Sequence, residues 1–166
     1  MRSLNGSCAV KAADLAPLFG ALTEHARRCW PEECCGLLLE DGRGAIQFEP
    51  IVNVAGSRAA QGTSTRTVRD GYVMDPKALL AALEKVDKEG GRLAAIVHSH
   101  PEVGAYFSRE DREMALGGGT EPLWPDVQYL VISVRNGRVD EARLFSWDAP
   151  RADFLEEQVS GIAANI

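Results

Sequence analysis

The feature that most constrains the fold is the apolar stretch RLAAIVHSH, residues 92–100, which ends in two histidines. Its unbroken apolar run, LAAIV, is typical of a buried strand. A second apolar run, VQYLVISV at residues 127–134, is followed by Asn-Gly and then by RVDEARLFSW, which predicts a hairpin. Strands this apolar need helices or a second sheet to cover them, so the remaining segments must supply that cover.

Several segments have the pattern of such helices. Residues 13–30 carry apolar side chains at helical spacing, with Asp14 as the expected cap. Residues 75–91 open on Asp-Pro and close on Gly-Gly, which are typical helix boundaries. Ser108 is expected to cap a third helix. Residues 150–163 are predicted to form a short C-terminal helix.

The other segments predict strands and loops. CGLLLE at residues 35–40 and AIQFEPIVNV at 45–54 flank a turn, which predicts another hairpin. TVRDGYVMD at 67–75 is expected to be a short strand, and residues 55–66 and 117–124 are expected to be loops. Together these elements predict an α/β (α+β) fold, a twisted mixed β-sheet flanked by helices, as one domain over residues 1–166.

Composition narrows the classes of protein. The chain has 166 residues, and its net charge of −6 disfavours binding to nucleic acids or to acidic membrane surfaces. No stretch is long and apolar enough to predict a membrane span, and the start lacks the apolar centre of a signal peptide. We therefore expect a cytoplasmic protein whose four cysteines are mostly buried thiols rather than a disulfide framework.

The two histidines at the end of the apolar strand suggest a metal site. Alternate strand residues face the same way, so His98 and His100 can present two imidazoles together. Asp111, one helical turn after Ser108, can supply a third ligand. Two nitrogens and one carboxylate leave a fourth position of zinc open, which marks a catalytic site. Ser108, on the same helix face, is suited to donate a hydrogen bond to a developing oxyanion.

Hydrolysis at such a site also needs a base that is not itself a ligand. Glu33, just before the apolar run at 35–40, is the best candidate, whereas Glu110 and Glu113 look like solvent-facing helix residues. A purely structural interpretation stays open for each residue alone. The histidines can be a hydrogen-bonded pair, Ser108 a helix cap, and Asp111 a residue that complements the helix dipole.

The combined pattern resembles a known family. HSHP at residues 98–101 and S-x-x-D at 108–111, with seven residues between His100 and Ser108, resemble the signature of the JAMM (MPN-plus, JAB-type) metalloproteases. Upstream, PEECCGLLL at 31–39 is similar to the segment that carries the catalytic glutamate of that family. The resemblance covers roughly residues 10–147 and is to the short bacterial and archaeal members.

The resemblance implies an MPN/JAB fold of cytidine-deaminase-like architecture and one Zn²⁺ per chain, held by His98, His100 and Asp111. Glu33 would be the general base and Ser108 would steady the tetrahedral intermediate. Substrates would be ubiquitin-like or sulfur-carrier proteins, cut after a C-terminal Gly-Gly. The polar loop 55–66 and the loop 117–124 could flank a groove for that tail. Assembly as a homodimer is left open.

Two other functions remain open from the sequence. The family also contains members that have lost ligands and serve as binding or scaffold modules, although the ligand set is complete here. A zinc amidohydrolase that acts on a small amide conjugate would need the same chemistry with a different groove. One departure from the family pattern is Phe107, where many members have proline; this changes the loop and removes no catalytic group.

Overall fold

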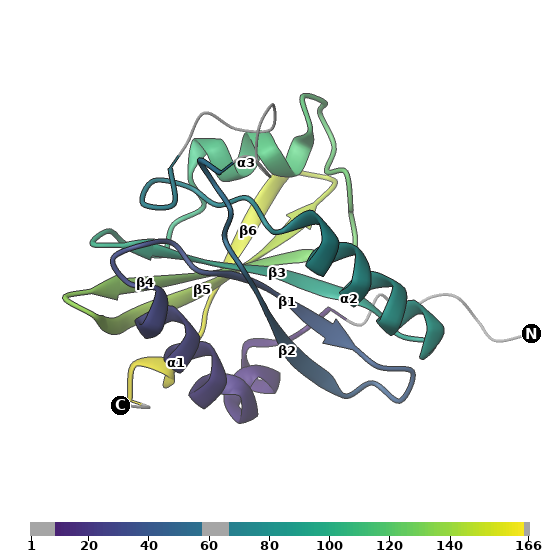
Figure 1. Cartoon of the computed structure of the whole chain (residues 1–166). Helices are drawn as coiled ribbons and strands as arrows, with labels where there is room; N and C mark the ends of the chain where they lie inside the picture. Colours follow the sequence, from purple (N-terminus) through teal and green to yellow (C-terminus); the bar gives the residue numbers. More distant parts are fainter. Residues whose placement is uncertain (1–8, 58–66, 165–166) are drawn as a thin grey trace, which may run out of the picture.

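The computed structural model describes residues 9–57 and 67–164. Within these residues, a six-stranded sheet carries helices on both of its faces (Figure 1). None of the described helices has the length and apolar character needed to cross a membrane. In chain order the elements, with η for a 3-10 helix, are η1 (Ala12–Leu18), α1 (Phe19–Cys29), β1 (Cys35–Glu40), β2 (Ile46–Ile51), α2 (Pro76–Lys88), β3 (Arg92–Pro101), α3 (Arg109–Leu116), β4 (Gln128–Arg135), β5 (Arg138–Asp148), β6 (Asp153–Gln158) and η3 (Ile162–Ala164).

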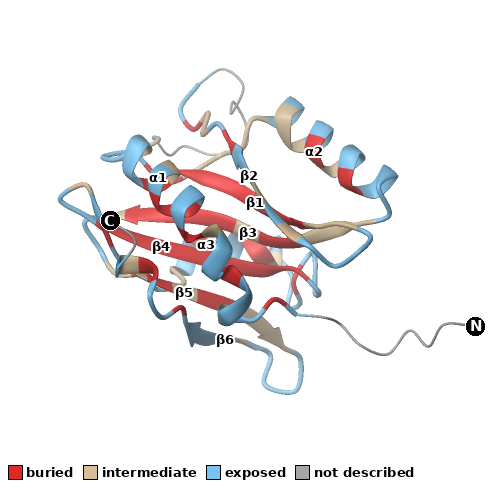
Figure 2. Ribbon diagram, turned by 90° about the horizontal axis from the view of Figure 1, so that it is seen from below, coloured by how far each residue is buried: buried red, intermediate tan, exposed pale blue. Residues whose placement is uncertain are grey.

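The sheet is mixed, with the strand order β2-β1-β3-β4-β5-β6. Strands β3 and β4 pair in parallel, and all other neighbours are antiparallel. The expected mixed sheet flanked by helices is therefore confirmed, as are both predicted hairpins. Strand β3 lies in the middle and is hydrogen-bonded on both sides, so the histidines at its end sit on a rigid support (Figure 2).

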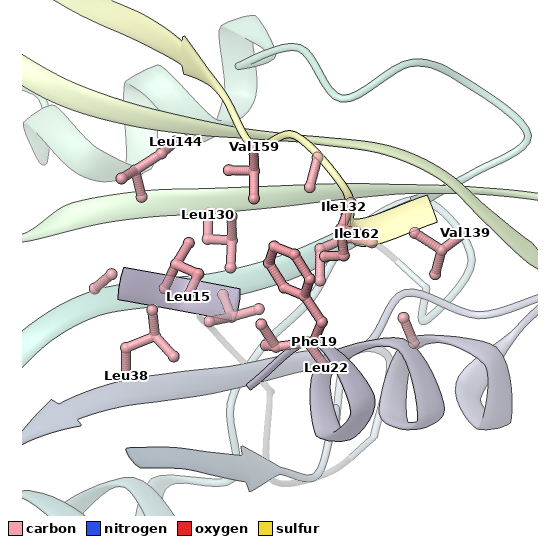
Figure 3. Packing of buried hydrophobic residues seen from close by; sticks show 14 of the residues in the cluster. Leu15, Phe19, Leu22, Leu38, Leu130, Ile132, Val139, Leu144, Val159 and Ile162 are labelled. Atoms are coloured by element: carbon pink, nitrogen blue, oxygen red, sulfur yellow. The ribbon is translucent and has the colours of Figure 1, made fainter. Parts of the chain in front are cut away.

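One face of the sheet packs against α1 and the two 3-10 helices. Leu15, Phe19 and Leu22 point from this layer into the sheet (Figure 3). They meet Leu130, Ile132 and other side chains of β1, β3, β4 and β5, and most of this cluster is fully buried. The helix predicted over 13–30 begins as η1 and becomes an α-helix at Phe19. Pro17 lacks the N–H that an α-helical bond would need.

The opposite face is covered by α2 and α3, which lie on the same side of the sheet (Figure 1). Helix α2 starts as predicted, since Asp75 accepts a hydrogen bond from the Ala78 N–H at 2.9 Å and Pro76 follows it. Its apolar side chains pack in a cluster with residues of β1, β2 and β3, while a separate cluster beneath α3 contains Tyr129, Val131 and Phe145.

The predicted C-terminal helix over 150–163 is wrong. Residues Asp153–Gln158 form β6, an edge strand that pairs with β5, and only Ile162–Ala164 are helical. Phe154 lies opposite Trp147, with ring centroids 5.1 Å apart, and also packs on Phe107 at 4.8 Å. These contacts and the strand pairing outweigh the local preference of a short polar segment.

The predicted strand over 67–75 is also wrong. Asp70 accepts hydrogen bonds from the Thr67 N–H at 2.7 Å and from the Thr67 hydroxyl at 2.8 Å, which closes a turn. Only Met74 pairs like a strand residue, in an isolated bridge with Asn53. Of the loop expected at 55–66, residues 58–66 lie outside the described part of the chain.

Candidate metal centre

The two motif histidines lie at the end of β3 and face α3. Both are buried, with 0% of His98 and 5% of His100 exposed. Ser99 between them points to the other face, where its hydroxyl accepts a hydrogen bond from the Cys34 N–H at 2.8 Å. This bond ties the end of β3 to the segment that follows Glu33, so the histidines and Glu33 share one support.

The third predicted ligand lies in the first turn of α3. The Ser108 hydroxyl accepts a hydrogen bond from the Asp111 N–H at 3.1 Å, and Asp111 Oδ2 accepts one from the Ser108 N–H at 2.9 Å. This reciprocal capping box fixes both side chains at the helix start. The Ser108 hydroxyl also donates to Asp111 Oδ2 at 2.6 Å. The cap therefore presents the Asp111 carboxylate to the histidines.

These three side chains converge closely enough to share one metal ion. Nε2 of His98 lies 3.2 Å from Nε2 of His100 and 3.2 Å from Oδ1 of Asp111. Nε2 of His100 lies 3.4 Å from Oδ2 of Asp111. The donor atoms all fall within 4.8 Å of one another, and the three residues are buried. Two imidazoles and one carboxylate are a donor set that suits zinc.

Hydrogen bonding prepares His100 for that role. Its Nδ1 lies 3.1 Å from the carbonyl oxygen of Gly104. Because a carbonyl only accepts, Nδ1 carries the proton and Nε2 keeps the lone pair that a metal needs. Nδ1 of His98 is buried and has no partner within the described residues. An uncompensated polar atom in so buried a place is typical of a functional site.

The charges of the three groups depend on one another. Burial raises the pKa of the Asp111 carboxyl, but the adjacent imidazoles and the Ser108 hydroxyl outweigh burial and hold it well below its usual range. Burial lowers the pKa of His100, but its hydrogen bond to Asp111 and the charge of that carboxylate outweigh burial and raise it. Asp111 is therefore an anion at neutral pH, as a metal ligand must be.

Glu33 reaches the same site from the start of β1. It is buried, with 8% exposed. Its N–H donates to the carbonyl of Val68 at 2.7 Å, and its carbonyl accepts from Nδ2 of Asn53 at 3.0 Å. Glu33, His100, Ser108 and Asp111 all line one cavity of about 290 Å³. The neighbouring Glu32 is exposed.

Two aromatic residues that the sequence analysis did not assign complete the surroundings of the histidines. The Tyr72 ring stacks on His98 with centroids 4.8 Å apart, and the Tyr106 ring lies 5.1 Å from that of His100. Burial raises the pKa of Tyr72 well above its ordinary value, so it stays a neutral phenol. Both tyrosines follow turn residues in the chain, and no periodicity in the sequence points to them.

Among the described residues, the thiols next to Glu33 do not join the group formed by His98, His100 and Asp111. Cys34 packs in the core on the α1 side, and burial raises its pKa to about 12. The thiol of Cys35 donates a hydrogen bond to the carbonyl of Ile51 at 3.5 Å, and burial raises its pKa as well. Both are buried structural thiols, as the sequence analysis expects for most of the cysteines.

A second cavity, of about 370 Å³, also reaches Asp111. It lies between α2 and α3 and is mostly apolar. The loop predicted at 117–124 contributes Leu123 and Trp124 to its wall, so that loop flanks the site. Tyr72 and Met114 form further parts of the wall. Asp111 thus separates two cavities of different character, one apolar and one lined by charged groups.

Comparison with known proteins defines the class. Residues 15–149 match the family described as prokaryotic homologs of the JAB domain. Since the match covers most of the chain, this protein belongs to that family, and the resemblance seen in the sequence is confirmed. Solution structures of a protein from Desulfitobacterium hafniense and of one from Salinibacter ruber share the fold, with TM-scores of 0.59 and 0.56. They are 25% and 24% identical, and each match covers 86% of both chains.

Among curated relatives, a desampylase of Haloferax volcanii is 31% identical over 105 residues, which is 62% of this chain. The match spans less than two thirds of that protein, 63% of its length. A CysO-cysteine peptidase of Mycobacterium tuberculosis is 29% identical over 132 residues, 78% of each chain. The chain is therefore similar to JAB-family hydrolases that are named desampylase and CysO-cysteine peptidase.

Proposed function

We propose that this chain is a zinc-dependent peptidase or isopeptidase. It hydrolyses the amide bond after the C-terminal Gly-Gly of a ubiquitin-like or sulfur-carrier protein. The observation that carries the proposal is the convergence of His98, His100 and Asp111 beside a cavity that Glu33 also lines. We further propose that residues 1–166 act as a single domain with one zinc ion per chain.

The three proposed ligands fit zinc by their chemistry. Two neutral imidazoles and a carboxylate leave room for a further ligand, as in catalytic rather than structural zinc sites. Zinc held there would supply the Lewis acid that makes water acidic near neutral pH and polarises an amide carbonyl. The Gly104 carbonyl supports this role, since its hydrogen bond orients the His100 ring.

Glu33 and Ser108 have the remaining roles. Glu33 takes a proton from the attacking water and later hands it to the leaving amine, which needs a carboxylate that binds no metal. Ser108 donates a hydrogen bond to the oxyanion that forms on the former carbonyl. Its hydroxyl donates to Asp111 in this structure, so the role requires the hydroxyl to turn towards the substrate.

The apolar cavity between α2 and α3 suits the tail that leads to the scissile bond. It ends at Asp111, and Leu123 and Trp124 form one wall. An extended tail with small C-terminal residues can reach a buried metal, whereas bulkier side chains would pack farther out in this cavity. The names of the relatives, desampylase and CysO-cysteine peptidase, favour a carrier protein as substrate.

The test is zinc content and hydrolysis in matched variants. Glu33→Gln should keep about one zinc per chain and lose activity by about 10²–10⁴-fold, because the glutamate is a base and not a ligand. Glu32→Gln is the control, since that neighbour is exposed. His98→Ala combined with His100→Ala should retain no zinc. The substrate is a ubiquitin-like carrier extended by a short peptide beyond its Gly-Gly.

Each alternative function has its own result in this test. Native protein that takes up no zinc would support a metal-free binding or scaffold module. Native protein that binds zinc and cuts small amides, but never the carrier, would support a small-molecule amidohydrolase. If the Glu33→Gln variant kept full activity, Glu33 would not be the general base.

A further inference from the structure

The loop that joins the two histidines to α3 is attached to the sheet by side chains of β4 and β5. The Ser133 hydroxyl, on β4, donates a hydrogen bond to the carbonyl of Val103 at 2.6 Å. Oε1 of Glu141, on β5, accepts one from the Ala105 N–H at 3.0 Å. Ser133 and Glu141 lie opposite each other in the antiparallel pairing, so their side chains share one face of the sheet. A cross-strand pair thus holds the loop between the proposed ligands.

The hydrogen bond to Glu141 comes from the peptide unit that also contacts His100. The Ala105 N–H and the Gly104 carbonyl belong to the same planar peptide unit, in which the two groups point in opposite directions. Glu141 accepts from the N–H at 3.0 Å, and the carbonyl oxygen lies 3.1 Å from Nδ1 of His100. A contact that fixes the N–H therefore also directs the carbonyl at the imidazole.

The Glu141 carboxylate is well placed for this contact. Its donor residue, Ala105, is only 1% exposed, so water has little access to the bond. A Cβ at Gly104 would lie 3.2 Å from Oε1 of Glu141, so the glycine leaves room for the carboxylate. The hydrogen bond from Ala105 and the charge of Arg143, whose Nη2 lies 3.4 Å from Oε2, outweigh burial and lower the pKa of Glu141. Glu141 is therefore an anion at neutral pH.

The strength of the Gly104 carbonyl as an acceptor affects which nitrogen of His100 carries the proton. A neutral imidazole has a single N–H. Two acceptors compete for it, the Gly104 carbonyl at Nδ1 and Oδ2 of Asp111, which lies 3.4 Å from Nε2. Only a proton on Nδ1 leaves Nε2 free to bind a metal. An anion that is hydrogen-bonded to the N–H of the same peptide unit polarises it and makes the carbonyl a stronger acceptor.

We propose that Glu141 is a positioning residue for the metal centre, which orients His100 and holds its proton on Nδ1 through the peptide unit of Gly104 and Ala105. This inference rests on the proposed function, in which His100 binds zinc through Nε2. Histidines that bind metals usually donate their second N–H directly to a carboxylate, a carbonyl or water. Here the carboxylate acts on the histidine through one intervening peptide unit.

The test measures zinc affinity and the tautomer of His100 in the same variants. In competition with a chelator, Glu141→Ala should bind zinc about 10–100-fold more weakly than native protein. Proton–nitrogen NMR spectra of the zinc-free proteins, at a pH where the imidazole is neutral, report which ring nitrogen of His100 carries the proton. It should be Nδ1 in native protein and partly Nε2 in Glu141→Ala. Glu141→Gln keeps an acceptor oxygen and should recover most of both properties.

Two further variants are matched controls. Asp140→Ala removes the same charge from the neighbouring residue, which is exposed and paired with Arg135 at 3.1 Å. Ser133→Ala removes the other attachment of the loop, at the Val103 carbonyl. Both should keep the native tautomer and bind zinc more tightly than Glu141→Ala. If Glu141→Ala does not fold, Glu141→Asp keeps the charge on a side chain one methylene shorter and should show the same loss.

Several results would overturn the inference. They are native zinc affinity in Glu141→Ala, an unchanged His100 tautomer in that variant, or an equal loss in either control. Glu141→Gln with zinc affinity as low as that of Glu141→Ala would also overturn it, because the hydrogen bond would then not be the cause. Native protein that took up no zinc would contradict the proposed function, while the tautomer in the zinc-free protein would still decide the role of Glu141.

Discussion

Asn53 connects the segments that surround Glu33, and its removal is the most informative perturbation of the fold around the site. Its Nδ2 donates to the carbonyls of Glu33 and Gly71, both at 3.0 Å. Its Oδ1 accepts from the N–H groups of Ala55 and Val73, also at 3.0 Å. One amide side chain thus satisfies four backbone groups from three segments of the chain.

The magnitude of the effect of Asn53→Ala follows from these four bonds. A neutral hydrogen bond contributes about 1 kcal/mol net, which sets an upper value of about 4 kcal/mol. Asn53 is only partly buried, so water can replace some of the lost partners. We expect the free energy of unfolding to fall by about 2–3 kcal/mol, which corresponds to about 4–12 °C in Tm.

Urea unfolding, zinc content and hydrolysis should be measured on the same preparations. Zinc content should not change, because Asn53 contacts none of the three proposed ligands, whereas hydrolysis should fall because Glu33 is held less firmly. Gln47→Ala removes an exposed amide on β2 and should alter stability by less than about 0.5 kcal/mol. If Asn53→Ala were as stable and as active as Gln47→Ala, the connecting role of Asn53 would be refuted.

Two further predictions concern packing and metal affinity. Gly36→Ala should destabilise the protein by about 1–3 kcal/mol in urea unfolding, because an added Cβ would lie 2.6 Å from Phe48 Cε2 and 2.7 Å from the Glu49 carbonyl oxygen. Gly20→Ala, where nothing lies within 4 Å, should not destabilise it, and equal losses for both would contradict this account. Zinc affinity should fall as the pH is lowered through the raised pKa of His100, above the usual value of about 6.5, because the proton and the metal compete for the imidazole. Competition titrations between pH 5 and 8 check this, and an affinity that is constant over the range would contradict it.

The parts of the fold that the sequence predicted are those with strong local signals. The apolar run of β3 and the Asn-Gly hairpin of β4 and β5 need little beyond their own residues to be recognised. The caps Asp75 and Ser108 lie where their patterns placed them. Helices and strands that begin or end on such residues could be predicted because local chemistry and the final structure agree there.

Elements whose conformation depends on distant partners could not be predicted. Strand β6 forms because it pairs with the free edge of β5 and because Phe154 packs against Trp147, Phe107 and Tyr129. The turn at residues 67–70 is joined to Glu33 by a backbone hydrogen bond that spans 35 residues of chain, from Glu33 to Val68. Neither contact leaves a pattern in the sequence, so the strand and the turn became visible only in the structure.

The structural and chemical interpretations of Ser108 and Asp111 are not alternatives. The same hydrogen bonds that start α3 hold the Asp111 carboxylate within 3.4 Å of His98 and His100. A free aspartate side chain would lose rotational entropy on meeting a metal, whereas here the capping box has already ordered it. The helix start at Ser108 and the proposed metal ligand one turn later therefore depend on the same hydrogen bonds, and a substitution that breaks the cap should also misplace Asp111. This explains why each residue alone looks like an ordinary helix-start residue, while their spacing from the two histidines indicates a metal site.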